Sequence, residues 1–224
     1  MRALEGRQIS FTYPGGKPLL SQVNFSVKPG ECVILRGPSG SGKTTLCHIA
    51  AGIIPRSISG DFQGEILLWG QELQGLSLAQ VVQELGILMQ NPDAQLFFPT
   101  VEDELAFGPE NLCLPRGEIA LRIAEALDAV EMSTYRLAEI ETLSQGQKQR
   151  IALAAVLALR PRILILDEAF SQLDTASTAI VQGVLRRQKE LGHAIFLVEN
   201  GEEHLHLADR LYELRDGEVR EVTL

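Results

Sequence analysis

Gly37-Pro38-Ser39-Gly40-Ser41-Gly42-Lys43-Thr44-Thr45 is the stretch of sequence that decides the fold. Its spacing is that of a glycine-rich loop followed by a lysine and a hydroxyl residue, a pattern that holds nucleotide phosphates. The apolar run at residues 32–35 is typical of a buried strand that enters the loop, and residues 43–51 leave it with helical spacing. Because strand, loop and helix follow one another in the order that the motif requires, a simple glycine turn is a poor alternative.

The chemistry of this loop follows from its residue types. Glycines allow the backbone to turn its N–H groups inward around an anion, and the N-terminus of the following helix adds a partial positive charge. Lys43 is expected to reach the outer phosphates, and the hydroxyl of Thr44 is expected to bind magnesium. The loop therefore predicts a site for a nucleotide and its metal ion.

The composition is that of an ordinary globular chain. Of its 224 residues, 22% are charged and 45% are hydrophobic, which indicates neither a disordered nor a membrane protein. We expect one domain with a helical insert. The formal net charge of −9 argues against general nucleic-acid binding, which needs a basic surface, but it does not argue against a locally held nucleotide.

Two further features concern the cellular setting. The longest strongly apolar segment, residues 151–159, is too short to cross a bilayer, and residues 1–6 lack the features of a signal peptide. The three cysteines, Cys32, Cys47 and Cys113, form no CxxC pair and are interpreted as reduced thiols. We therefore expect a cytoplasmic protein.

The rest of the chain alternates between strand and helix patterns. The sequence predicts strands at residues 8–11, 23–27, 64–70, 81–88, 162–168, 194–198, 211–214 and 218–222, and helices at residues 151–159, 175–191 and 202–209. Residues 91–141 have a helical texture with Thr100 as a cap, and we interpret them as a subdomain inserted into a nucleotide-binding core of residues 1–90 and 142–224. The predicted fold class is α/β: a P-loop NTPase core with a mainly parallel sheet, an antiparallel β subdomain and an inserted α-helical subdomain.

Asp167 and Glu168 follow a run of four aliphatic residues, the pattern of a buried strand that ends in two carboxylates. A phosphate loop needs a carboxylate to hold magnesium, directly or through water, and Asp167 is the candidate. If the strand continues, Glu168 points to the opposite side and can face an attacking water instead. The alternative is a solvated strand end, which the aliphatic run makes a poor explanation.

These motifs, in this order, resemble the ATP-binding cassette (ABC) ATPases over nearly the whole chain. The resemblance is carried by the loop at residues 37–45, the strand and carboxylates at residues 163–168, and the family signature at residues 143–147. It implies ATP and Mg²⁺ as cofactors, with Tyr13 stacking on adenine and Gln90 contacting magnesium and the attacking water. It also implies that residues 171–174 form the loop that couples two nucleotide sites.

The family works as a dimer that sandwiches two ATP molecules, each between one subunit's phosphate loop and the other's signature. The resemblance therefore assigns Ser144, Gln145, Gly146 and Gln147 to the partner's ATP. A helix N-terminus that Ser144 caps, with small residues beside it, is a physically reasonable second anion site. The expected partner is a second ABC ATPase subunit, in a homodimer or a heterodimer.

Two departures from the family pattern bear on hydrolysis. Gln145 stands where the signature has its second glycine, which places a bulky amide at a point of close approach. Glu199 and Asn200 stand where the family carries its switch histidine, and an ionised Glu199 would be repelled by a γ-phosphate. His204 and His206 lie too far along the chain and are interpreted as solvated. We therefore expect slow or absent hydrolysis by the isolated chain, which leaves a hydrolysis-impaired partner of another ABC ATPase as an alternative.

Residues 90–97 and 101–108 resemble the energy-coupling-factor branch, whose importers take up vitamins or transition-metal ions. The resemblance places this region beside the groove that receives an integral membrane subunit, with Leu96, Phe97 and Phe98 as a docking patch. The acidic residues 102–104 would meet basic side chains there. The alternative is a local core and a solvated helix start. The protein is then expected at the inner face of the cell membrane, and a soluble non-transport ABC ATPase is the rival class.

Overall fold

Two β-sheets form the centre of the structure, a computed structural model that describes residues 1–223. The strands span Leu4–Thr12 (β1), Pro18–Val27 (β2), Cys32–Arg36 (β3), Asp61–Leu68 (β4), Gln71–Glu72 (β5), Leu85–Leu88 (β6), Ile163–Asp167 (β7), Ala194–Glu199 (β8), Arg210–Arg215 (β9) and Glu218–Val222 (β10). One sheet has the order β10-β9-β3-β8-β7-β6 and is parallel except for β10, which pairs antiparallel with β9. The other has the order β2-β1-β4-β5 and is antiparallel throughout. The predicted fold class is confirmed.

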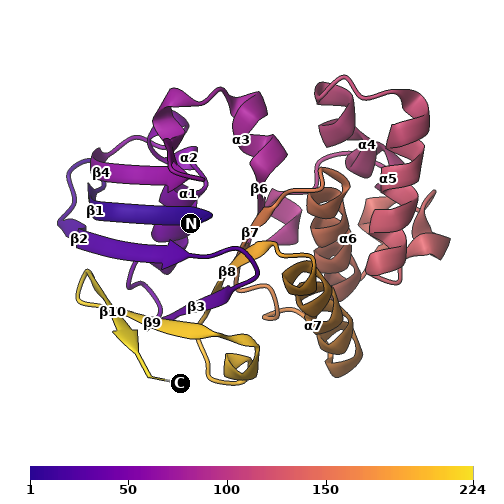
Figure 1. Ribbon diagram of the computed structural model, residues 1–224. Helices are drawn as coiled ribbons and strands as arrows, with labels where there is room; N and C mark the ends of the chain where they lie inside the picture. Colours follow the sequence, from indigo (N-terminus) through magenta and orange to yellow (C-terminus); the bar gives the residue numbers. More distant parts are fainter. Residues whose placement is uncertain (224) are drawn as a thin grey trace.

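Helices lie on both faces of the six-stranded sheet, and the four longest lie on the face away from the antiparallel sheet. The helices span Lys43–Ala50 (α1), Ile53–Arg56 (α2), Leu78–Glu84 (α3), Val101–Asn111 (α4), Arg116–Ala129 (α5), Gln145–Ala158 (α6) and Thr175–Glu190 (α7). Figure 1 shows the antiparallel sheet on the left, the parallel strands in the middle, and α4, α5 and α6 on the right. Within residues 1–223, none of these helices has the length and apolarity needed to cross a bilayer.

The strands that lead to the site are buried along their whole length. Every residue of β7 and β8 is buried, and β3 is buried up to Arg36 at its end. Such continuous apolar runs are typical of parallel strands that are covered on both faces. In the parallel register, Arg36 lies opposite Glu199 and Asp167 opposite Val198. The polar residues that end these strands therefore meet at one edge of the sheet.

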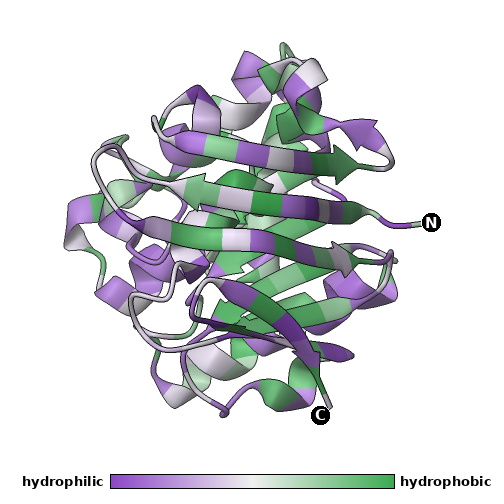
Figure 2. Ribbon diagram, turned by 90° about the vertical axis from the view of Figure 1, so that its left-hand side faces the viewer, coloured by the Kyte–Doolittle hydropathy of each residue, from purple (hydrophilic) through white to green (hydrophobic). Residues whose placement is uncertain are grey.

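Two hydrophobic cores lie on opposite faces of the six-stranded sheet. The helix-side core contains the buried residues of α4 to α7 together with Leu164 and Leu166 of β7. The sheet-side core contains those of β1, β2 and α1 together with Ile163 and Ile165. Successive side chains of a strand point to opposite faces, so β7 serves both cores in alternation. Figure 2 shows hydrophobic and hydrophilic residues alternating along the strands of the antiparallel sheet.

Two sequence predictions of secondary structure are wrong. Residues 81–84 of the predicted strand at 81–88 belong instead to the helix α3, because Ser77 and Gln80 make a reciprocal capping box that starts a helix at Leu78. Only β6 is extended. In the predicted helix at residues 202–209, the only helical part is a single 3₁₀ turn, Leu205–Leu207.

Candidate nucleotide-binding site

The predicted phosphate loop connects β3 to α1, as its sequence context required. Gly40 and Gly42 have φ values of 77° and 104°, in the region that favours glycine. A Cβ at Gly37 would lie 2.3 Å from the carbonyl oxygen of Leu214 in β9, so only glycine fits there. Gly42 also precedes the first residue of α1, which directs the free N–H groups of that helix toward the loop.

Lys43 lies buried within this loop. Its ammonium donates hydrogen bonds to the carbonyl oxygens of Gly37, at 2.7 Å, and Pro38, at 2.9 Å. Burial lowers the pKa of the Lys43 ammonium, and nearby Glu168 and Asp167 oppose that effect. The cation is thus held inside the loop by backbone oxygens. An ammonium and a ring of backbone N–H groups are the groups that bind phosphate oxygens.

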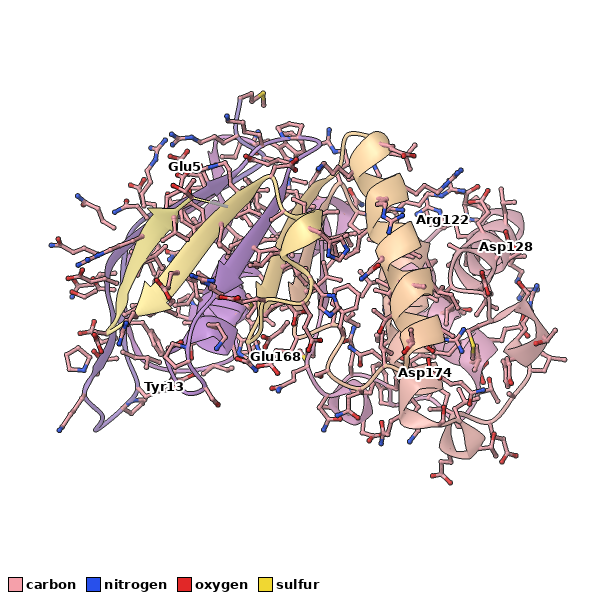
Figure 3. All side chains as sticks on the ribbon, turned by 90° about the horizontal axis from the view of Figure 1, so that it is seen from below. Glu5, Tyr13, Arg122, Asp128, Glu168 and Asp174 are labelled. Atoms are coloured by element: carbon pink, nitrogen blue, oxygen red, sulfur yellow. The ribbon has the colours of Figure 1, made fainter. Side chains whose placement is uncertain are left out.

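Tyr13 lies beside the helix that follows the loop. The hydroxyls of Tyr13 and Thr45 share a hydrogen bond of 3.1 Å, and the Tyr13 ring packs edge-on against Phe11 with centroids 4.8 Å apart. Tyr13 as a whole is 38% exposed. In Figure 3, Tyr13 and Glu168 lie along the same edge of the molecule.

Asp167, the last residue of β7, has the character of a metal ligand. Its side chain is buried, and its Oδ1 makes no hydrogen bond among residues 1–223. Burial raises the pKa of Asp167, and a hydrogen bond from Thr44 opposes the rise. A carboxylate oxygen without a partner, next to a hydroxyl, is the donor set that Mg²⁺ prefers. Thr44 and Asp167 therefore fit a magnesium ion.

Glu168 and Gln90 are brought together although they are far apart in the sequence. The Gln90 amide, just after β6, donates a hydrogen bond of 2.8 Å to Glu168 Oε2. The expectation that β7 continues through Glu168 is wrong. Glu168 has a left-handed φ of 49°, and its N–H donates to the carbonyl of Val198 at 2.9 Å. This turn, rather than strand alternation, separates the Glu168 side chain from that of Asp167.

Glu199 ends β8 at the same edge, and its Oε1 makes no hydrogen bond within the described chain. Burial, together with Glu168, Asp167 and Glu203, raises the pKa of Glu199 to about 8. Its register neighbour Arg36 bonds Glu202 instead, at 2.9 Å. The interior thus disfavours the charged form of Glu199.

His204 is packed rather than solvated, contrary to the interpretation of the sequence. Its ring lies 4.0 Å from that of Phe170 between centroids, and it shares a hydrogen bond with Gln182. His206 is exposed. Neither histidine is at the end of β8, where the family carries its switch residue.

The signature begins α6. Ser144 accepts a hydrogen bond from the N–H of Gln147 and donates its own N–H to the Gln147 side chain, a complete capping box. The Gln145 amide donates to Asp93 at 2.8 Å. Asp93 was not among the residues selected from the sequence. Ser144 and Gln145 are exposed, and no hydrogen bond among the described residues joins the signature to residues 37–45.

The aromatic patch differs from the predicted one in one member. Leu96 is buried in the helix-side core, so it is not a surface residue. Phe107 takes its place: the rings of Phe97, Phe98 and Phe107 lie 4.8–5.2 Å apart, and Phe97 is 64% exposed. We call Phe97, Phe98 and Phe107 the aromatic patch.

The acidic residues beside the patch are largely occupied within the chain. Buried Glu104 accepts the N–H groups of Phe97 and Phe98, both at 2.9 Å. Glu102 pairs with Arg136. These contacts weaken the idea that residues 102–104 form a free acidic surface, and they show Glu104 shaping the loop that presents the rings.

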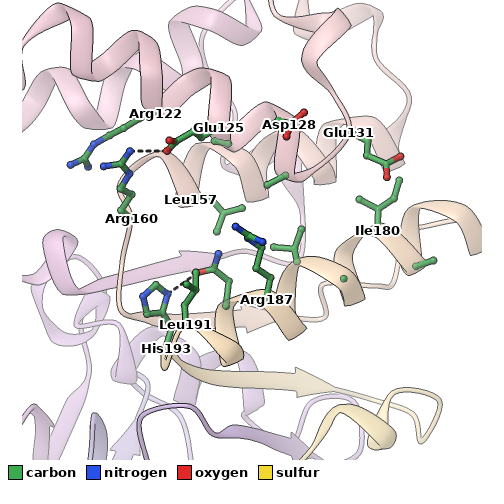
Figure 4. Close-up of a pocket in the computed structure, with 16 residues that line it drawn as sticks. Arg122, Glu125, Asp128, Glu131, Leu157, Arg160, Ile180, Arg187, Leu191 and His193 are labelled. Atoms are coloured by element: carbon green, nitrogen blue, oxygen red, sulfur yellow. Dashed lines mark hydrogen bonds and ion pairs between the residues drawn. The ribbon is translucent and has the colours of Figure 1, made fainter.

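A cavity of about 960 Å³ lies between α5 and α7, away from these residues. Figure 4 shows Arg160 paired with Glu125 and His193 with Gln188 along its wall, both at 2.7 Å. None of its lining residues belongs to the phosphate loop or the signature. The candidate site is therefore the strand-end edge, and this cavity is separate from it.

Comparison with known proteins supports the class that fold and site define. The family described as ABC transporter matches residues 20–171, so the chain belongs to the ABC transporter family. A putative ABC transporter ATP-binding protein of Methanosarcina acetivorans is 42% identical over 98% of this chain and 36% of its own length. The chain spans only 36–38% of the length of the first three curated relatives that it matches.

Two further relatives are similar over most of both chains. The energy-coupling factor transporter ATP-binding protein EcfA of Methanocaldococcus jannaschii is 36% identical over 98% of this chain and 78% of its own. Among solved structures, CbiO1 of Clostridium perfringens, described as part of the ABC transporter complex CbiONQ, is 30% identical with a TM-score of 0.84. That alignment covers 98% of this chain and 87% of CbiO1.

Proposed function

We propose that the chain binds and hydrolyses ATP and powers an ABC importer through ATP-driven closure of a dimer. The observation that carries the proposal is the meeting, at one edge of the parallel sheet, of the Lys43 loop, the unpartnered Asp167 oxygen and the Gln90–Glu168 pair. Phosphoryl transfer needs charge neutralisation and a positioned water, and these are the groups that supply them.

Each residue has a defined role in this proposal. Residues 37–45 hold the phosphates through backbone N–H groups, and Lys43 exchanges its two carbonyl acceptors for phosphate oxygens. Thr44 and Asp167 hold Mg²⁺, which neutralises phosphate charge when bound. Glu168 orients and deprotonates the attacking water, with Gln90 fixing its carboxylate. Tyr13, which is partly exposed, stacks on adenine.

The signature serves a second nucleotide-binding subunit in this proposal. Ser144, Gln145, Gly146 and Gln147 lie at the N-terminus of a capped helix whose free N–H groups attract an anion. Ser144 and Gln145 are exposed and make no hydrogen bond to this chain's own phosphate loop among the described residues, which leaves them available to a partner's ATP.

The proposed transporter is of the energy-coupling-factor type, for a vitamin or a metal ion, with the chain peripheral on the inner face of the membrane. The name of the EcfA relative and the aromatic patch support this assignment. Exposed rings on a loop whose backbone is hydrogen-bonded to Glu104 are suited to receive an apolar segment of an integral membrane subunit.

A second candidate function is a nucleotide-binding partner that is itself impaired in hydrolysis. The observation that favours it is Glu199, which stands at the position of the family's switch histidine. Burial disfavours the ionised form of its carboxyl, and neither form offers the γ-phosphate a positive charge. In that case another subunit supplies most of the turnover.

Glu168→Gln distinguishes the two candidates. In the assembled complex, we expect turnover to fall at least ~100-fold with ATP binding retained if this chain is catalytic. An unchanged rate with intact nucleotide binding would support the impaired partner. Glu190→Gln, an exposed glutamate at the end of α7, is the matched control. Loss of nucleotide binding by the Lys43→Ala variant tests the site itself.

A further inference from the structure

Asp93 joins the loop that carries Gln90 to the first turn of the signature helix. Its Oδ2 accepts from the Gln145 amide at 2.8 Å, and its Oδ1 accepts from the Lys148 ammonium at 2.7 Å. Both oxygens of one carboxylate are therefore committed to two side chains of α6. Gln145 and Lys148 are three positions apart, so they lie on one face of the helix. Lys148 and Gln145 together lower the pKa of Asp93, so Asp93 is ionised at neutral pH.

The loop that runs from β6 to Asp93 is itself held by specific hydrogen bonds. The Asn91 side chain accepts the N–H of Asp93 at 3.1 Å. Gln95 accepts the N–H of Met89 at 2.9 Å and donates to the carbonyl of Ile87 in β6 at 3.2 Å. These bonds brace the segment from β6 to Asp93. A displacement of Gln90, which bonds Glu168, is therefore transmitted to Asp93 through a short, cross-bonded segment.

We propose that Asp93 is a positioning residue that couples this chain's own nucleotide site to its signature. Nucleotide contact at Gln90 and Glu168 is passed through Asp93 to Gln145 and Lys148, and so orders the start of α6. The proposal rests on the proposed function, in which the signature faces a partner's ATP. The proposal also accounts for the glutamine at position 145, because a glycine there would have no side chain with which to bond Asp93.

The geometry around Gly146 is consistent with this assignment. A Cβ at Gly146 would lie at an ordinary contact distance, 3.4 Å, from the carbonyl oxygen of Gln172, so this turn of α6 lies beside residues 171–174. The Gln145 side chain bonds Asp93 within its own chain. The glutamine that replaces the second glycine of the signature therefore makes a contact within its own chain.

Hydrogen exchange of the isolated full chain, followed by mass spectrometry with and without Mg-AMP-PNP, tests the link. In the wild type, we expect the nucleotide to slow exchange at residues 37–46 and also at residues 145–150. In Asp93→Ala, protection at residues 37–46 is expected to persist while the protection gained at residues 145–150 falls at least fivefold. Asp128→Ala, an exposed aspartate of α5 whose side chain makes no hydrogen bond among residues 1–223, should behave like the wild type.

A mutant cycle separates positioning from a general structural effect. If Asp93 acts through its two partners, adding Asp93→Ala to a Gln145→Ala, Lys148→Ala variant changes protection at residues 145–150 no further, whereas an additive loss overturns the proposal. Equal protection of residues 145–150 in the wild type and Asp93→Ala also overturns it. Absence of protection at residues 37–46 in the wild type would instead overturn the proposed nucleotide function, on which the link depends.

Discussion

The amide of Gln90 donates a hydrogen bond of 2.8 Å to the carboxylate of Glu168, across 78 positions of the chain. One residue follows β6 and the other follows β7, so the contact depends on the parallel pairing of those two strands. The bond fixes the direction of the carboxylate before any substrate arrives. A carboxylate that is already oriented loses little further freedom when the reaction occurs.

Gln90→Ala is expected to lower the ATP turnover of the assembled complex by ~10–100-fold with a small change in KM for ATP. The reason is that the Glu168 carboxylate loses its hydrogen-bonded partner while the phosphate loop stays intact. Steady-state kinetics measure both constants. Gln74→Ala, an exposed glutamine outside the site, is the control. A rise in KM with unchanged kcat would show that Gln90 serves binding instead.

Lys43→Ala is expected to weaken nucleotide binding by at least ~100-fold. The buried ammonium is the one cationic side chain inside the loop at residues 37–45, and neutral alanine offers phosphate nothing in its place. Titration with a fluorescent ATP analogue measures the dissociation constant. The exposed Lys28→Ala variant controls for net charge. Equal affinities for wild type and Lys43→Ala would remove the loop from the proposed site.

Glu199 is expected to make the folded chain less stable as the pH rises. Its pKa is raised from 4.5 to about 8, so the folded state binds this proton more tightly than the unfolded state. The stabilisation is complete below the unfolded pKa and is lost as the pH rises through 8. Between pH 5 and pH 9, the wild type should lose roughly 3–5 kcal/mol more free energy of unfolding than Glu199→Gln.

Urea unfolding of the nucleotide-free chain in a chelator, at pH 5, 7 and 9, measures this difference. Glu110→Gln, at an exposed glutamate of α4, should follow the wild type. Parallel pH profiles for the wild type and Glu199→Gln would mean that Glu199 ionises without a cost to the fold.

Phe97→Asp is expected to abolish co-purification with an integral membrane subunit and to leave ATP affinity within about twofold. Phe97 is the most exposed ring of the aromatic patch, and a carboxylate there would be desolvated by an apolar partner. Leu121→Asp, on an exposed leucine of α5, provides the matched control. Retention of the complex by Phe97→Asp would exclude the patch as the docking surface.

The strands that carry the site could be predicted because each is an uninterrupted apolar run that ends in a polar residue. This pattern located Asp167 and Glu168, together with Glu199 at the end of its strand. It did not reveal the left-handed turn at Glu168, because a backbone angle at one residue leaves no mark in periodicity. The helix α3 did carry a local signal, the Ser77 and Gln80 capping box, which the apolar composition of residues 81–88 concealed.

Contacts between polar residues that are far apart in the chain could not be predicted from the sequence. Asp93 is exposed and meets Gln145 and Lys148 at separations of 52 and 55 positions, so neither spacing nor burial singles it out. Phe107 joins the aromatic patch only because α4 folds back over the loop that carries Phe97. Such residues are found from tertiary structure, which brings together side chains that no local pattern relates.

The alternation of β7 between two cores has a consequence for how the protein can diverge. Leu166 belongs to the core that contains the signature helix α6, whereas Ile165 belongs to the core that contains α1, the helix of the phosphate loop. A change of volume at either residue is felt on one face of the sheet and is shielded from the other. The core that contains α6 can therefore be repacked by substitutions on one face of β7 while the core that contains α1 keeps its packing.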